Sequence, residues 1–154
     1  MATTLTAATL TVTVTESISL NGKDQGATNS FTVASINEVY KHIVTATTTV
    51  TTFLKFGTAA SAGTLIRANV KYLRITNLDA ANNLILHLEE ASGNHDTQLV
   101  VRPLNSFLLS SLIIDNQADI DNAVYEGGSE LQIDKITGLA DNADIDIELV
   151  IVTT

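Results

Sequence analysis

Polar and apolar residues alternate with a period of two along much of the chain, as they do in a β-strand that has one buried side. Between Leu10 and Leu20 every odd position is threonine or serine, and the even positions are apolar except Glu16. From 144 to 151 the pattern returns, with isoleucine or leucine at the odd positions and acidic residues at most even ones. The pattern predicts a strand at each end of the chain, with one side in a core and the other in water.

Turn-forming residues recur at short intervals between these two segments, beginning with Asn21-Gly22. The strands predicted between the turns are 31–36, 39–44, 50–56, 66–77, 84–90, 98–102, 106–114, 123–125 and 130–136. No linker separates them, so we expect one domain over residues 1–154. Its expected fold is an all-β antiparallel sandwich or jelly roll of about eight to ten short strands.

One segment also fits a helix. Ser35-Ile36-Asn37-Glu38 has the form of a capping box, and Val39, Tyr40 and Ile43 continue at helical spacing. The threonines and β-branched residues that follow are poor helix formers, so a helix here would be a single turn. A strand is the favoured interpretation.

Composition supports strands and excludes several classes of protein. Of the 154 residues, 22 are threonine, 45% are hydrophobic and 16% are charged, which is too apolar for a disordered chain. Apolar runs are only a few residues long, so we expect no membrane span, and the first residues do not resemble a secretory signal. The lack of cysteine excludes disulfides and thiolate metal sites.

The net charge of −9 arises entirely after Pro103, because residues 1–103 carry seven basic and seven acidic side chains. Phosphate binding needs clustered lysine and arginine, so we expect no nucleic-acid partner. The acidic last third either attracts a basic partner or a cation, or forms a solvated outer face that keeps the protein in solution.

Two acidic segments resemble each other, Asp115–Asp121 and Asp141–Asp146. Calcium sites present several oxygens on a tight loop, usually with glycine at the bend, and neither segment has that glycine. Each Asp-Ile-Asp step would put two like charges on one face of a strand unless a cation lay between them. Ordinary loop-to-strand boundaries are the favoured interpretation, with a calcium site as the alternative.

Other chemistry-bearing residues form no recognisable motif. His42, His87 and His95 lack the spacing of a zinc site, and neither a serine nucleophile motif nor a glycine-rich phosphate loop is present. The sequence therefore assigns no catalytic, cofactor-binding or metal residue, and we expect no enzyme. A carbohydrate-binding sandwich would need aromatic rings, for which the chain offers no tryptophan and the tyrosines Tyr72 and Tyr125, besides Tyr40.

Three pieces carry a likeness to known proteins: residues 15–22 (TESISLNG), 71–79 (KYLRITNLD) and 106–109 (SFLL). In this order they resemble small virion structural proteins of tailed bacteriophages, especially marine ones. Relatives often place a glycine just before the Ser-Phe pair, whereas this chain has Pro103-Leu104-Asn105.

The resemblance implies a capsid decoration or cement protein, located on the virion surface after synthesis in the host cytoplasm. Its partners would be further copies of itself, a trimer being favoured, and the major capsid protein. Many copies would reinforce the shell by binding energy alone. The alternatives are a tail tube, head-to-tail connector or fibre-base subunit, for which an acidic channel would suit DNA passage, and a non-viral carbohydrate- or protein-binding module.

Two features of the sequence indicate contacts. Residues 1–12 carry no charge and could form an N-terminal arm or add an edge strand to a neighbour. Val150 and Val152 interrupt the acidic side of the last strand, so either a neighbouring subunit or a loop of the same chain should cover them.

Overall fold

The structure is a computed structural model that describes residues 6–61, 63–90, 96–110, 112–114 and 131–154. Its strands are β1 (Ala8–Thr15), β2 (Ser19–Leu20), β3 (Lys23–Asp24), β4 (Thr28–Ile36), β5 (Glu38–Ala46), β6 (Thr51–Gly57), β7 (Leu65–Ile66), β8 (Val70–Asn77), β9 (Leu84–Glu90), β10 (Asp96–Val101), β11 (Ser106–Leu109), β12 (Ile113–Ile114), β13 (Leu131–Ala140) and β14 (Ile145–Thr153). The described residues hold one helix, the 3₁₀ turn η1 (Arg67–Asn69), and no helix among them could span a membrane. The predicted all-β class is confirmed.

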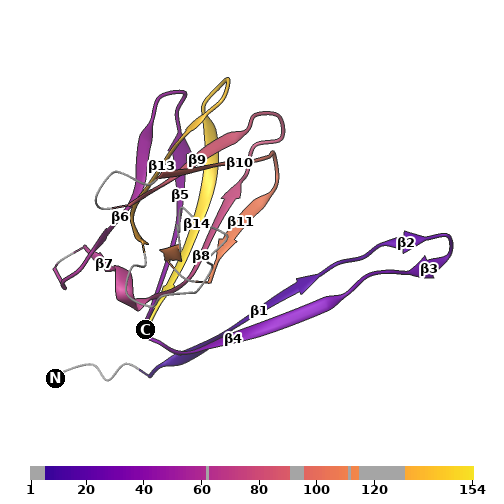
Figure 1. The fold of residues 1–154 in the computed structure, drawn as a ribbon, viewed down its shortest axis with the longest axis horizontal. Coiled ribbons are helices and arrows are strands. Elements are labelled where there is room, and N and C mark those ends of the chain that lie inside the picture. The colour runs from indigo at the N-terminus through magenta and orange to yellow at the C-terminus, as the bar shows by residue number, and fades with distance from the viewer. Residues whose placement is uncertain (1–5, 62, 91–95, 111, 115–130) are drawn as a thin grey trace, which may run out of the picture.

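Two sheets pack face to face to form a sandwich (Figure 1). The four-stranded sheet has the order β11-β8-β14-β5 and is antiparallel throughout. The six-stranded sheet has the order β10-β9-β13-β6-β7, with β12 also paired to β13, and within it β6 and β7 are parallel. The remaining ladders of that sheet are antiparallel, as the sequence pattern predicts.

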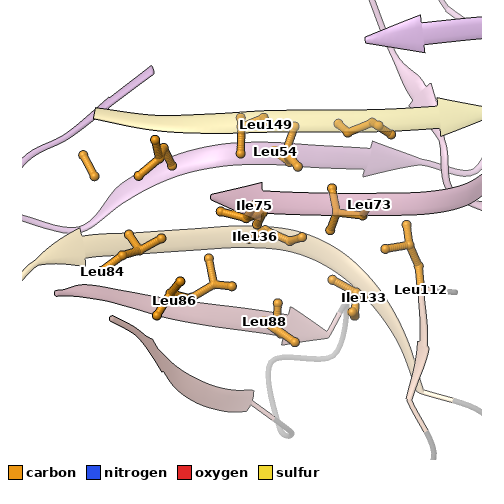
Figure 2. Packing of buried hydrophobic residues seen from close by; sticks show 14 of the residues in the cluster. Leu54, Leu73, Ile75, Leu84, Leu86, Leu88, Leu112, Ile133, Ile136 and Leu149 are labelled. Atoms are coloured by element: carbon orange, nitrogen blue, oxygen red, sulfur yellow. The ribbon is translucent and has the colours of Figure 1, made fainter. Parts of the chain in front are cut away.

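The core lies between the inner faces of the two sheets, as Figure 2 shows. On β14 the residues Ile147, Leu149 and Ile151 are fully buried and alternate with more exposed ones, so the period of two that the sequence shows does mark the core side. The six-stranded sheet contributes Leu84, Leu86, Leu88, Ile133 and Ile136 from its inner face.

Most predicted strands appear with small changes of boundary. β9 has the predicted bounds of 84–90, and the 66–77 segment divides into β7, η1 and β8. The single strand predicted at 106–114 is wrong, because this segment divides into β11, which pairs with β8, and β12, which pairs with β13 in the other sheet. The segment 35–40 is not helical: β4 runs into β5 with only Asn37 between them, and Ser35 has a φ angle of 59°. The predicted strand at 123–125 lies outside the described residues.

A two-stranded arm, residues 8–36, leaves the sandwich at the end where the C-terminus lies (Figure 1). β1 pairs with β4, and β2 with β3, in one continuous antiparallel register from Leu10 opposite Val33 to Leu20 opposite Lys23. Asn21 and Gly22 close it with φ angles of 53° and 74°, the conformation of a tight type I′ turn. The paired stretch is about 35 Å long at roughly 3.3 Å per residue.

The prediction that the even side of residues 10–20 lies in a core is wrong for the outer half of the arm. Val14, Ile18 and Leu20 are 48%, 55% and 61% exposed. A period of two identifies the apolar side of a strand, but what covers that side depends on the rest of the fold. Here the outer half of the arm projects past the body of the protein (Figure 1).

The base of the arm covers part of the outer face of the four-stranded sheet. Ile36, Tyr72 and Val152 form a second buried cluster, against which Leu10, Val12, Val33 and Val150 pack. Of the two covers considered for the valines at 150 and 152, the structure therefore shows the same chain, and Val152 is 1% exposed. The described part of residues 1–12 belongs to this arm as one strand of a hairpin, not as a free strand.

Candidate interaction surfaces

The candidate chemical residues lie apart from one another. His42 is exposed on β5, with its ring 5.8 Å from that of Tyr40. His87 is on β9 in the six-stranded sheet, with its Nδ1 3.6 Å from a carboxylate oxygen of Glu89. His95 lies outside the described residues. The structure does not bring His42 and His87 into one site.

The acidic segment Asp141–Asp146 makes hydrogen bonds within the protein. Asp141 accepts hydrogen bonds from the backbone and side chain of Asn83 at 3.0 and 2.6 Å, and Asp146 accepts one from the Thr45 hydroxyl at 2.9 Å. Asp144 accepts a long one, 3.3 Å, from the backbone N–H of Thr48. Among the described residues no group of three or more His, Asp and Glu side chains could hold a metal ion. The similar segment Asp115–Asp121 lies outside them.

Most of these bonds belong to the end of the sandwich opposite the arm, which we call the loop end: residues 47–50, 78–83, 102–105 and 141–144 (Figure 1). Its loops are joined by backbone bonds, such as those from Leu104 to Asp79 and from Asp141 to Asn83, at 3.0 and 3.1 Å. Backbone groups at a loop surface otherwise rely on water, so these bonds hold the loop end together as a unit.

Two residues of segment 71–79 organise the loop end. Asn77 is fully buried; its amide donates to the carbonyls of Asn82 and Val101 at 2.9 and 3.2 Å, and its oxygen accepts from the N–H of Asp79 at 3.0 Å. Asp79 in turn accepts from the N–H groups of Asn82 and Ala81, which lowers the pKa of its carboxyl group. The segment thus has a structural role in this fold.

The outer face of the four-stranded sheet carries a group of three charges. Glu148 lies 2.9 Å from the Lys41 ammonium and 2.5 Å from the Arg74 guanidinium. The hydrogen bond from Lys41 lowers the pKa of Glu148; partial burial opposes this, and Arg74 adds to the lowering. Two cations share one carboxylate, so this group has a net charge of +1.

A second carboxylate is held on the six-stranded sheet. Burial by itself would raise the pKa of Glu89, but hydrogen bonds from Lys135 and Thr137, with the Lys135 charge, bring it below its ordinary value. These groups come from the adjacent strands β9 and β13, which the register brings opposite each other. An ion-paired carboxylate of this kind is a common structural feature of a sheet surface.

The tyrosines do not form a sugar-binding platform in the described residues. Tyr72 is 6% exposed beneath the arm, where its ring lies 6.4 Å from that of Phe31. Tyr40 is half-buried against the core, and Tyr125 lies outside the described residues. A hollow of about 600 Å³ beside Tyr40 is lined by Glu38, Lys55, Ser61 and Thr64, among others, and the Ser61 and Thr64 hydroxyls hydrogen-bond to each other.

The arm is the feature that sequence reasoning missed, and it has two chemically different sides. Residues on one strand that directly face those on the other share a side. One side carries only threonine, serine, glycine and aspartate: Thr11, Thr13, Thr15, Ser17, Ser19, Asp24, Gly26, Thr28, Ser30 and Thr32. The opposite side is mostly apolar: Leu10, Val12, Val14, Ile18, Leu20, Ala27, Phe31 and Val33, with Glu16, Lys23, Gln25 and Asn29.

The turn signal at Asn21-Gly22 and the alternation on both of its flanks could have identified this hairpin from the sequence. The inner half of its apolar side packs on the sheet, and the outer half, from Val14 to Leu20, is exposed. An exposed apolar surface that continues a packed one is typical of a protein–protein contact.

No family model, curated protein or solved structure matches this chain.

Proposed function

We propose that this chain is a non-enzymatic structural subunit of a tailed-bacteriophage particle, and that it binds to the outside of the capsid shell as a decoration or cement protein. The likeness of residues 15–22, 71–79 and 106–109 to phage virion proteins points to the particle. The geometry that supports an assembly role is the arm, whose apolar side extends beyond the body that bears it.

An arm of this kind is suited to bind another subunit. A two-stranded hairpin without further packing is marginally stable in water, so the outer half of the arm gains little within its own subunit. Contact with another subunit would bury its apolar residues and order it. Repeated over many copies, such contacts join neighbouring subunits and resist expansion of the shell through binding energy alone.

The experiment mixes the purified full-length chain with empty capsid shells of the phage that encodes it, and measures co-sedimentation and the melting temperature of the shells. We expect the chain to sediment with the shells and to raise their melting temperature, because a ligand that binds only the assembled state stabilises it. Immunogold labelling of the intact particle should then mark the head.

A matched control is the tip-shortened chain, which lacks Thr15–Leu20 and Lys23–Thr28, so that Asn21-Gly22 joins Val14 directly to Asn29. These two residues already face each other in the hairpin, so the register and the two-residue turn are preserved. We expect this chain to bind the shells at least about tenfold more weakly, because linked contacts are lost. Absence of binding by the full-length chain, or label on the tail, would refute the capsid role.

A further inference from the structure

We propose that the outer half of the arm's apolar side docks onto the outer face of the four-stranded sheet in a second copy of this chain. The inference rests on the chemistry of two surfaces of the described chain and does not depend on a capsid.

The proposed contact continues one that the structure already contains. The inner half of the same side lies on Tyr72 and Val152, which belong to the outer face of the four-stranded sheet. The outer half continues the same apolar side in an unbroken register beyond the edge of the body. The surface that suits the inner half in this chain is therefore the kind of surface that suits the outer half in another copy.

The outer face of the four-stranded sheet also has an open region. Directly paired residues share a face of a sheet, which places Val39 beside Val152, Ile43 beside Glu148 and Leu108 beside Arg74. Val39, Ile43 and Leu108 are 61%, 56% and 42% exposed. They surround the charged group formed by Lys41, Arg74 and Glu148, so the open region is apolar at its margins and charged at its centre.

The charges of the two surfaces are complementary. Glu16 lies between Val14 and Ile18 on the arm's apolar side, is exposed, and has no ion-pair partner in the part of the chain that the structure describes. The group around Glu148 on the sheet has one excess positive charge. An arm that lies on this face can place its single carboxylate at that centre while its apolar residues contact the margins.

Lys23 on the arm and Asp146 on the sheet form a second pair of opposite charges, which lie in the same order as the first pair. Lys23 lies on the same side of the arm as Glu16, nearer the tip. On the sheet, Asp146 follows Glu148 on the same face toward the loop end. This order directs the tip of the arm toward the loop end of the second copy.

The size of the contact indicates how copies join. The outer half of the arm, about 23 Å long and two strands wide, offers on the order of 300 Å². A stable interface buries about 800 Å² on each partner, so one arm alone is too small. If every copy gives one arm and receives one, as happens in a closed ring or a reciprocal pair, each subunit buries on the order of 600 Å², twice the area of a single contact.

The test uses disulfide cross-linking, for which the cysteine-free chain provides a clean background. One protein carries Ile18→Cys on the arm, and a second protein with an affinity tag carries Val39→Cys, Ile43→Cys or Leu108→Cys. The matched control replaces Ile18→Cys with Ser17→Cys, the neighbouring residue on the polar side of the arm. A disulfide needs Cα atoms within about 7 Å, so its formation reports direct contact.

After mild oxidation of the mixed full-length proteins, we expect a mixed disulfide dimer with at least one of the three sheet positions. Its yield should exceed that of the Ser17→Cys control several-fold. Equal yields from the two arm positions, dimers formed only between two Ile18→Cys chains, or no cross-link at any sheet position would overturn the proposal. No capsid is present, so a failure here is distinct from a failure to bind shells.

Discussion

Replacing Asn77 with alanine removes a fully buried amide from the centre of the loop end, and its cost can be estimated from the bonds that it makes. The side chain donates to the carbonyls of Asn82 and Val101 and accepts from the N–H of Asp79. At about 1 kcal/mol for each hydrogen bond, the loss of three reduces the free energy of unfolding by about 3 kcal/mol. The carbonyl of Val101, in a residue that is only 4% exposed, also loses this partner.

The same estimate converts into a melting temperature. A chain of this length unfolds with an entropy of about 0.3 kcal/mol/K, so a loss of about 3 kcal/mol lowers the melting temperature by about 9 °C. Thermal and urea unfolding followed by circular dichroism would measure both quantities. All variants should be compared at one protein concentration, because association stabilises the folded state.

Asn82→Ala is the control for this prediction, since it removes an amide from the same loop whose side chain makes one long bond, 3.3 Å, to Asp79. We expect it to cost about 1 kcal/mol or less. If Asn77→Ala destabilised the protein no more than Asn82→Ala does, the account of the loop end as a unit held together by Asn77 would be refuted.

Three further predictions concern the sheets and the arm. Gly138→Ala should reduce the free energy of unfolding in urea by about 1–3 kcal/mol, because an added Cβ would lie 2.6 Å from the Ile85 carbonyl oxygen and 2.7 Å from the Phe53 ring. An unchanged midpoint of urea unfolding would contradict this. The pKa of Glu148 is lowered in the folded state, so its ionised form stabilises the fold at neutral pH, and that contribution is lost as the pH falls from the ordinary value of 4.5 through the lowered pKa. The stability difference between the native chain and Glu148→Gln should therefore narrow in melts below pH 4.5, and a constant difference from pH 7 to pH 3 would exclude this effect. The tip-shortened chain should have the same free energy of unfolding in urea as the full-length chain, to within about 0.5 kcal/mol, when both are diluted to monomers, and a larger loss would show that the tip supports the body.

Much of the fold could be predicted from the sequence, because an all-β protein shows its core side through a period of two. The pattern located β9 to the residue and identified β14 with its buried isoleucines and leucines. The arm could not be predicted in the same way. Its period of two is as regular as that of β14, and only tertiary structure distinguishes a strand within a sandwich from a strand that projects beyond one.

The same limit applies to single residues. Asn77 is plain in the sequence, but the carbonyls that its amide binds are at 82 and 101, so its role depends on residues distant along the chain. Val152 could be recognised as an apolar residue on an acidic side, and the structure shows that the arm, joined to the same sheet through β5, covers it. The histidines and aspartates were visible in the sequence, yet their distances from one another follow only from strand order.

We infer that the outer half of the arm holds copies of this chain together. Light scattering behind a size-exclusion column tests it most directly, with the full-length and tip-shortened chains run at the same concentrations. We expect the full-length chain to have a mass several times that of one subunit, with three copies favoured, and the tip-shortened chain to elute as a monomer. A full-length chain that is monomeric at every concentration, or two chains with the same number of copies, would contradict the claim.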